Sequence, residues 1–379
     1  MATKQLNLRA SASSRWIACP ASAWLSAQMP YVEGGEAAKI GTAIHSLAEH
    51  CFKGDLDPTK FEGQVFEGIL MTEENCEFAL EHLKAIWKIE DELGVSQLLC
   101  VEYFLPYQEN TIYKCGGTAD VIGISKEKRK LIIADLKTGR GYVDQDSEQL
   151  KLYALAAMEN IGDWSVKKNG IKIEKKSGLY KEIDTIELWI IQPHHGETRK
   201  HTMTTQELVD WEHYVLTPAI ENALNPAFPP VPSDSACQYC PAKTICPAQQ
   251  QIVEVVASAP PIEMLSEQQI SVLLAQFDMV EDYIKAVRDH ALKRMESGAV
   301  IDGWQLTPKR ALRSWTKESD VVPALLACGL TIDQIVKQEL ITPAAAEKLL
   351  PKDLKAAIEP LTSRISSGLT LARDKGLTQ

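Results

Sequence analysis

Residues 117–137 read GTADVIGISKEKRKLIIADLK, and they carry the most information about the fold class. It contains two short runs rich in valine and isoleucine, 118–125 and 130–137, and such runs are typical of buried strands. A charged segment at 126–129 separates the two runs, as the connection of a hairpin would. The stretch therefore predicts two neighbouring strands of a sheet.

Two acidic residues and a lysine mark the ends of these strands. Asp120 and Asp135 stand where the apolar runs stop, so adjacent strands would bring their carboxylates together. Asp135 and Lys137 are two positions apart on a strand, so their side chains share one face. Mg²⁺ and Mn²⁺ prefer such carboxylates together with water and substrate phosphate. The pattern predicts a cation site with an ammonium group beside it, which could orient the attacking water or offset charge in a transition state.

The segments around these strands extend the prediction to an α/β fold. The sequence predicts helices at about 36–52, 72–93, 147–160 and 205–225, and further strands at about 98–107, 111–114 and 186–192. Residues 7–28 are expected to form a short helical arm. This order of elements predicts a mixed central sheet flanked by helices.

The composition is that of an ordinary folded protein, since 45% of the 379 residues are apolar and 24% are charged. We expect a cytoplasmic protein, because the sequence shows neither a membrane-spanning run nor the apolar segment of a secretory signal. A net charge of −11 argues against a nucleic-acid coat protein. It does not exclude a nuclease, because an active site that collects divalent cations is itself acidic.

Two helices add further candidates for the site. Gly41 and His45 are four positions apart, and so are Gln149 and Tyr153, which places each pair on one helical face. Alone, His45 would be interpreted as a surface or hydrogen-bonded histidine. Beside a pair of strand carboxylates it could supply a nitrogen ligand to the metal.

The nine cysteines fall into one group and several single residues. Cys237, Cys240 and Cys246 lie close together and would supply three thiolates to a metal ion or cluster. Cys19 is the candidate for a fourth ligand, since it precedes the His45 helix and is followed by proline, as are Cys240 and Cys246. Spacing alone does not separate structural zinc from an iron–sulfur cluster, and cysteines without a metal are a further alternative. The single cysteines are interpreted as small buried hydrophobic residues.

Taken together, these motifs resemble the motif set of RecB-like PD-(D/E)XK nucleases. The matching series is Gly41-x-x-x-His45, Gly117-x-x-Asp120, Asp135-x-Lys137 and Gln149-x-x-x-Tyr153, and it covers roughly residues 10–250. The resemblance implies a PD-(D/E)XK restriction-endonuclease-like core and a metal-dependent deoxyribonuclease.

The resemblance also implies roles for individual residues. Mg²⁺ or Mn²⁺ would be held by His45, Asp120, Asp135 and the carbonyl of Leu136. Lys137 would be the catalytic lysine, with Glu102 as an acidic residue near the metals and Gln149 and Tyr153 positioning DNA or the site. RecB-like nucleases with a [4Fe–4S] cluster place one cysteine before the histidine motif and three after the core. This implies a cluster on Cys19, Cys237, Cys240 and Cys246.

The expected division of the chain has three parts. These are an N-terminal arm with the first cluster cysteine (1–35), the nuclease core ending in the three-cysteine segment (36–256), and a mainly helical C-terminal region (257–379). The last part would serve oligomerisation or bind DNA or a partner, and its residues 304–315 are predicted as a strand or hairpin. Basic residues in two segments could contact DNA, with solvated charges as the alternative: Lys167, Lys168, Lys172, Lys309, Arg310 and Arg313.

The sequence thus predicts a DNA exonuclease, and its layout is similar to phage-encoded RecB-like proteins, which implies a role in phage recombination or replication. Expected partners are DNA, a single-strand annealing or single-strand-binding recombination protein, and a second copy of the chain. Two alternatives stay open: a non-catalytic DNA-binding or scaffold protein that keeps the fold, and a zinc-bearing phage assembly protein. The intact Asp135-x-Lys137 pair argues against the first, and finding zinc in place of iron would indicate the second.

Overall fold

The structure is a computed structural model that describes most of the chain. The described residues are 5–30, 35–94, 98–108, 110, 112–167, 170–174, 178–196, 198–308, 312–315, 318–337, 339–340, 343, 346, 350, 354–365 and 369–373. The chain divides into two compact units, Met1–Val280 and Glu281–Gln379. The N-terminal arm and the expected core belong to the same unit, and the three-part division stays a prediction. None of the described helices combines the length and the hydropathy that a membrane span requires.

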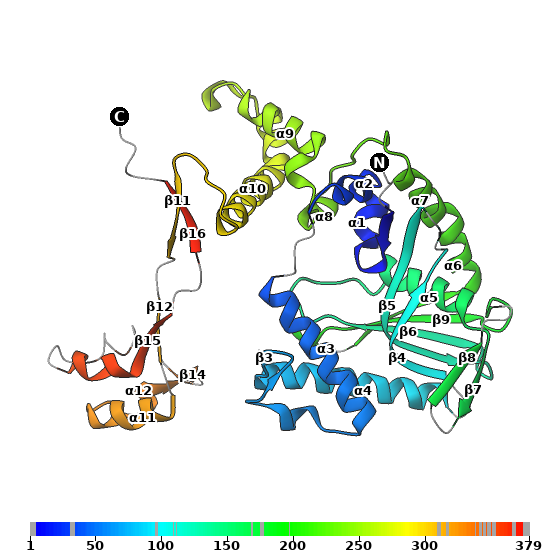
Figure 1. The fold of residues 1–379 in the computed structure, drawn as a ribbon, viewed down its shortest axis with the longest axis horizontal. Helices are drawn as coiled ribbons and strands as arrows, with labels where there is room; N and C mark the ends of the chain where they lie inside the picture. The colour runs from blue at the N-terminus through cyan, green and yellow to red at the C-terminus, as the bar shows by residue number, and fades with distance from the viewer. Residues whose placement is uncertain are drawn as a thin grey trace. The chain divides into compact units, whose positions relative to one another are not determined.

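The first unit is built around a six-stranded mixed sheet (Figure 1). Its strands are β1 (Leu6–Arg9), β4 (Leu98–Pro106), β5 (Tyr113–Ser125), β6 (Lys130–Leu136), β9 (Thr185–Ile191) and β10 (Arg199–Thr204). The order is β1-β5-β6-β9-β10, and β4 pairs with β5 as well. The pairs β1–β5 and β6–β9 are parallel, whereas β4–β5, β5–β6 and β9–β10 are antiparallel. The prediction of a mixed sheet flanked by helices is confirmed, and the two strands predicted at 111–114 and 118–125 are one strand, β5.

β5 changes its partner along its length. From Val121 onward it pairs with β6, whereas its first residues, 113–116, pair with β1. Because β4 pairs along 116–124, β1 and β6 share the other edge of β5. Among the described residues, 117–120 therefore have no strand partner on this edge, and β5 and β6 part there as a fork. Asp120 and Asp135 stand on the two sides of this fork.

Helices cover both faces of the sheet and bury two separate apolar cores. On one face, α3 (Glu36–Gly54) and α4 (Glu73–Leu93) pack against Val121, Ile132 and Ala134. On the other face, Leu131 and Ile133 pack with α5 (Glu148–Asn160), α1 (Ser13–Ala18), α6 (Thr205–Trp211) and α7 (Thr217–Leu224). Successive residues of β6 thus enter different cores, as the two-residue period of a strand requires.

The limits of α3 and α4 follow from local sequence. α3 begins after Gly35 and ends at Asp55, which adopts a left-handed conformation with φ of +50°. α4 begins after Thr72, whose hydroxyl accepts the backbone N–H of Asn75, and ends at Gly94. Two short hairpins complete this part of the chain: β2 (Val65–Phe66) with β3 (Ile69–Leu70), and β7 (Asp163–Lys167) with β8 (Gly170–Glu174).

The N-terminal segment differs from its prediction. A helical arm beginning at residue 7 is wrong, because Leu6–Arg9 forms β1 at the sheet. Leu6 and Leu8 alternate with polar residues, and this two-residue period buries both leucines in the α5 core. α1 and α2 (Ala21–Ala27) follow and place Cys19 between them. The later cysteines lie around α8 (Asp234–Gln238) and before α9 (Pro247–Ala257).

The long helix α10 (Glu267–Glu296) leads into the second unit, which combines helices with paired strands. Its further helices are α11 (Glu318–Ala327) and α12 (Ile332–Ile335). Its strands pair as β11 (Trp304–Pro308) with β16 (Leu369–Arg373), β12 (Leu312–Trp315) with β15 (Thr362–Ile365), and β13 (Val336–Lys337) with β14 (Glu339–Leu340). A hairpin over 304–315 is therefore wrong, because β11 and β12 each pair with a strand much later in the chain.

Candidate functional site

Asp120 and Asp135 face each other across the fork between β5 and β6. The last paired residues are Val121 and Ala134, so continuing the register places Asp120 opposite Asp135. At this point the Asp120 carboxylate accepts the backbone N–H of Leu136, with 2.7 Å between Oδ2 and N. Asp120 is 7% exposed and Asp135 2%. The separation of two strands thus holds two carboxylates in a largely buried position.

Three groups converge on the α3 side of the fork. His45 Nδ1 lies 3.3 Å from Asp120 Oδ2 and 3.4 Å from Glu102 Oε1. One ligand atom of each residue lies within 4.8 Å of the other two, a spacing that allows all three to bind one cation. Carboxylate oxygens favour Mg²⁺ or Mn²⁺, and an imidazole nitrogen adds affinity for transition metals. This set of ligands suits Mn²⁺ well.

Glu102 reaches this point through an uncommon backbone conformation. Its φ angle is +50°, in the left-handed region, which costs a residue with a side chain about 1–3 kcal/mol. Its neighbours on β4 keep the regular pairing with β5, which leaves Glu102 opposite Asp120. The strained residue thus directs a third acidic group toward His45. Local composition does not mark a left-handed residue within a strand, so the sequence could place Glu102 near the metals by resemblance alone.

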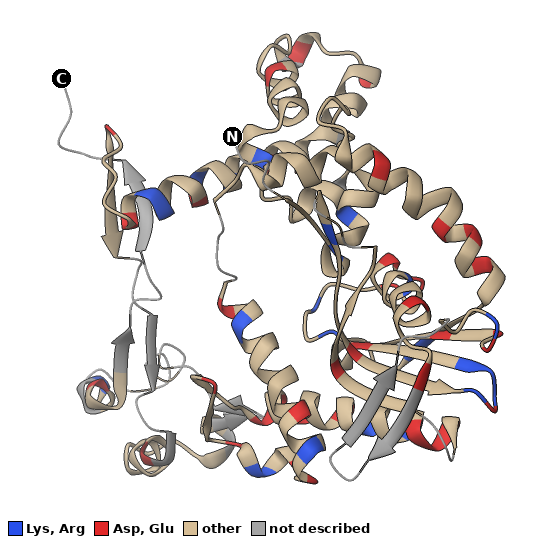
Figure 2. Ribbon diagram, turned by 45° about the vertical axis from the view of Figure 1, so that its right-hand side comes forward, with Lys and Arg blue, Asp and Glu red and all other residues tan. Residues whose placement is uncertain are grey.

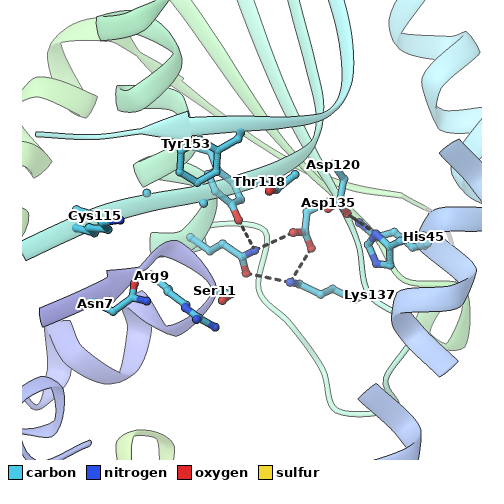
Figure 3. Close-up of a pocket in the computed structure, with 16 residues that line it drawn as sticks. Asn7, Arg9, Ser11, His45, Cys115, Thr118, Asp120, Asp135, Lys137 and Tyr153 are labelled. Atoms are coloured by element: carbon cyan, nitrogen blue, oxygen red, sulfur yellow. Dashed lines mark hydrogen bonds and ion pairs between the residues drawn. The ribbon is translucent and has the colours of Figure 1, made fainter. Parts of the chain in front are cut away.

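On the α5 side, Asp135, Lys137 and Gln149 form a closed network (Figure 3). Lys137 Nζ lies 2.6 Å from Asp135 Oδ2 and donates to Gln149 Oε1 at 2.9 Å. The Gln149 amide donates to Asp135 Oδ1 at 2.9 Å and lies 3.5 Å from the Tyr153 hydroxyl. Gln149 and Tyr153 meet because they are one turn apart on α5. The network fixes the ammonium group of Lys137 beside the carboxylates.

The concentration of acidic groups shifts the pKa values of the site. Burial alone would lower the pKa of His45, but Asp120, Glu102 and Asp135 outweigh burial and raise this pKa to about 9. Burial and the neighbouring Asp135 raise the pKa of Asp120 to about 7. Burial opposes the charge on Lys137, yet the carboxylates keep its pKa above the ordinary value. The site therefore retains protons at neutral pH, and a divalent cation would displace them.

A second histidine, which the sequence did not indicate, lies behind His45. His82 on α4 is 1% exposed, and its ring centroid is 6.1 Å from that of His45. Neither ring nitrogen of His82 hydrogen-bonds to a described residue. Burial, with a smaller effect of His45, lowers the pKa of His82 to about 3. His82 therefore packs behind His45 as an uncharged ring.

The groups of the fork line one cavity of about 680 Å³. All the predicted metal and catalytic residues except Glu102, which contacts His45, lie in its wall: His45, Asp120, Asp135, Leu136, Lys137, Gln149 and Tyr153. The sequence did not indicate that several other residues would line this cavity: Asn7, Arg9, Ser11, Phe104, Lys114 and Thr118. The alternation of leucine and polar residues at 6–9 was the signal that could have placed the first of them on a strand.

Three of the four cysteines of the expected cluster lie in one small apolar group. It comprises Cys19, Ala21, Leu25, Ala236, Ala242 and Cys246, with Cys240 packed against it. The fourth, Cys237, directly follows Ala236 in α8 and is buried as well. Burial is the main cause of the raised pKa of Cys19, and Cys246 and Cys237 are close enough to raise that pKa further. Cys19 Sγ also accepts the backbone N–H of Val231 at 3.3 Å.

Four of the other cysteines lie in the two cores of the sheet: Cys51, Cys76, Cys100 and Cys115. This burial is what the sequence predicts for cysteines that serve packing. Cys328 is partly buried against the small core of the second unit.

The basic residues that the sequence proposed for DNA contact are largely outside the described part of the chain. Lys168, Lys309 and Arg310 are outside the described residues, and of Lys167, Lys172 and Arg313 the structure describes the backbone but not the side chain. Elsewhere in the first unit, charges of both signs are interspersed along helices and strands (Figure 2). Phosphate contacts in the described part would therefore be local.

Comparison with known proteins places the chain in one family. Residues 6–376 match the model of the family described as "Protein of unknown function (DUF2800)", so the chain belongs to this family. Among solved structures, the crystal structure of SSO0001 is similar at 12% identity, over 65% of this chain and 88% of that chain, with a TM-score of 0.28.

Proposed function

We propose that the chain is a metal-dependent DNA exonuclease of the RecB-like PD-(D/E)XK type. One observation carries the proposal: His45, Glu102 and Asp120, which are close enough to bind one cation, adjoin the Asp135–Lys137 pair at a single fork in the sheet. Acidic cation ligands next to a fixed ammonium group can catalyse the hydrolysis of a phosphodiester. The exonucleolytic mode and a role in phage recombination or replication rest on the resemblance of the motifs.

The metal ligands fit a hard divalent cation. Three acidic side chains and one histidine gather where protons are retained at neutral pH, so a cation would relieve the repulsion among them. Mg²⁺ or Mn²⁺ bound there would act as a Lewis acid and lower the pKa of a water molecule. Asp120 is held for this role by the Leu136 N–H, and Glu102 by its backbone conformation.

Lys137 would act on the reacting phosphate. Its ammonium group is oriented by Asp135 and Gln149, and all three residues line the cavity. A fixed cation at this place can hold the attacking water or stabilise negative charge that develops on phosphate oxygens. Tyr153 supports Gln149 from behind, so the α5 residues position the lysine.

The cysteine group is proposed to hold a [4Fe–4S] cluster with a structural role. Such a cluster would join the N-terminal arm to the end of the core. The choice of iron–sulfur over zinc rests on the resemblance of the cysteine arrangement to that of RecB-like nucleases.

The proposal is tested with purified protein on linear end-labelled DNA and on closed circular DNA, with Mn²⁺, with Mg²⁺ and with EDTA. An exonuclease releases nucleotides from linear DNA in the presence of the metal and leaves circular DNA intact. Cleavage of circular DNA would indicate an endonuclease. DNA binding without cleavage under any metal would support the non-catalytic scaffold in place of the enzyme.

A further inference from the structure

The sheet extends past the metal site and carries groups that the hydrolytic chemistry does not use. The α3–α4 core includes residues of β4 and β5 only as far as Val101 and Val121. Among the described residues, the parts of these strands that lie closer to β1 contribute nothing to this core. Beyond this point the same face of the sheet borders the cavity. The strand-binding face, as we call it, consists of Asn7 and Arg9 on β1, Phe104 on β4, and Lys114, Gly116 and Thr118 on β5.

The alternation of side chains explains why these residues share one face. Their sequence neighbours Leu8, Leu105, Cys115 and Ala119 are buried in the opposite core with α5. Strand register makes the face continuous, since Asn7 lies beside Lys114, Arg9 beside Gly116, and Phe104 opposite Thr118. At about 3.3 Å per residue, Thr118 is about 7 Å and Gly116 about 13 Å along β5 from Asp120.

Two cations of this face have no partner in the described structure. Arg9 and Lys114 are exposed, and neither side chain forms a hydrogen bond or ion pair with a described residue. By contrast, Lys130 and Lys200 at the other end of the sheet both pair with Glu92. Figure 3 shows Arg9 and Ser11 bordering the cavity across from His45. Unpaired cations in a cavity wall next to a metal site are suited to bind phosphate.

An exposed aromatic ring lies between these cations and the metal site. Phe104, near the end of β4, is 57% exposed and lines the same cavity. Bases of single strands stack on such rings, whereas bases of a duplex are already paired and stacked. The position of Phe104, two residues from Glu102, would place a stacked base next to the reacting phosphate.

Gly116 keeps the floor of this face open. Its φ is +118°, and a Cβ atom at this position would lie 2.2 Å from the carbonyl oxygen of Leu105. The close approach of β4 therefore requires glycine, and no side chain rises between Arg9 and Phe104. A nucleic-acid backbone can approach the strand directly here.

We propose that the strand-binding face binds a single strand of DNA beside the scissile phosphate, with an unpaired base on Phe104 and phosphates at Arg9 and Lys114. This inference rests on the proposed function and gives that function a preference for single-stranded ends.

Binding of a fluorescent oligothymidine of about 12 nucleotides, followed by anisotropy in Ca²⁺ with the intact oligonucleotide verified afterwards, tests the proposal. The double variant Arg9→Ala/Lys114→Ala should lower the slope of log K against log salt by about 1.4, since each phosphate contact on a single strand contributes about 0.7. Phe104→Ala should weaken binding by about tenfold or more. It should have no effect on binding of a blunt duplex, in which no base is free to stack.

Matched controls are Lys84→Ala, which removes an exposed charge on α4, and Tyr214→Ala, which removes an exposed ring. Both should bind the oligonucleotide as wild type does. Equal affinities and salt slopes for the face variants and the controls would overturn the proposal. Because binding is measured without hydrolysis, the two proposals fail separately. If the protein needs these residues for binding but cleaves no DNA, the single-strand-binding proposal is supported and the nuclease proposal is contradicted. If the protein cleaves DNA but the face variants bind as wild type does, the nuclease proposal is supported and the single-strand-binding proposal is contradicted.

Discussion

The Asp120 carboxylate accepts the backbone N–H of Leu136 across 2.7 Å, at the point where β5 and β6 part. A side-chain oxygen thus occupies the place that a strand carbonyl would take if the ladder continued. The bond satisfies a buried N–H, holds the carboxylate beside His45 and ends the pairing of the two strands. Asp120 therefore determines both where β5 and β6 separate and where a carboxylate stands beside His45.

Two substitutions of Asp120 should separate these two roles. Asp120→Asn retains an oxygen that can accept the Leu136 N–H, so the free energy of unfolding should stay near that of the metal-free wild type. Asp120→Ala leaves a buried N–H unpaired and should cost about 1–3 kcal/mol. Both variants should bind Mn²⁺ at least about tenfold more weakly, because a charged ligand is lost. Chemical unfolding and calorimetry measure the two effects. Equal Mn²⁺ affinity in Asp120→Asn and wild type would contradict the assignment of this ligand.

The pH dependence of metal binding should follow the two raised pKa values. The metal-free protein has His45 with a pKa of about 9 and Asp120 with one of about 7, so both lose protons when a cation binds. Mn²⁺ affinity should therefore rise between about pH 6 and pH 9.

The stability of the metal-free protein should change in the opposite direction. For both groups the pKa in the folded state exceeds the ordinary value of 6.5 or 3.8, so the folded chain binds more protons than the unfolded chain. The stabilisation from Asp120 is lost as pH rises through about 7, and that from His45 as pH rises through about 9. Thermal unfolding with and without Mn²⁺ measures both trends. A metal-induced rise in melting temperature that is constant over this range would contradict them, and His45→Gln should lose the trend above about pH 7.

The four grouped cysteines should determine the colour of the protein. Anaerobically purified protein should absorb broadly near about 400 nm, as expected for thiolate-bound iron. Replacing Cys19, Cys237, Cys240 or Cys246 by serine should bleach this absorbance and lower the melting temperature, because the link between the two ends of the unit is lost. Cys51→Ser is the matched control, since Cys51 is buried in the α3–α4 core, and it should keep the colour. Stoichiometric zinc without iron would contradict the iron–sulfur cluster but would be compatible with the four cysteine ligands. Full colour in Cys19→Ser would show that Cys19 is not one of these ligands.

The sequence predicted the parts of the fold in which local pattern and final environment agree. The helix carrying His45 and the helix carrying Gln149 were visible from spacing, and the structure has them at Glu36–Gly54 and Glu148–Asn160. The approach of Asp120 to Asp135 followed from apolar runs that stop at acidic residues. The structure places both residues in one cavity with His45 and Lys137.

What the sequence could not provide was long-range pairing and backbone strain. β1 lies parallel to a strand that begins more than 100 residues later, so nothing near Arg9 showed that it would border the site. Glu102 depends on a left-handed conformation that side-chain pattern does not encode. β11 and β12 resemble the arms of a hairpin, but each pairs with a strand near the C-terminus. For β1, β11 and β12 the decisive partner is distant in the chain, whereas for Glu102 it is the backbone conformation that no side-chain pattern predicts.

Lys137 and its neighbours are proposed to hydrolyse DNA with a divalent cation. The most direct measurement is the single-turnover rate of nucleotide release from end-labelled DNA in Mn²⁺, for wild type and for Lys137→Met. The substitution keeps the apolar stem and removes the ammonium group, so folding and Mn²⁺ binding should persist while the rate falls by about 100-fold or more. Lys84→Met, at an exposed ion pair on α4, should keep the wild-type rate. A Lys137→Met rate within about twofold of wild type, or no metal-dependent release by the wild type itself, would contradict the claim.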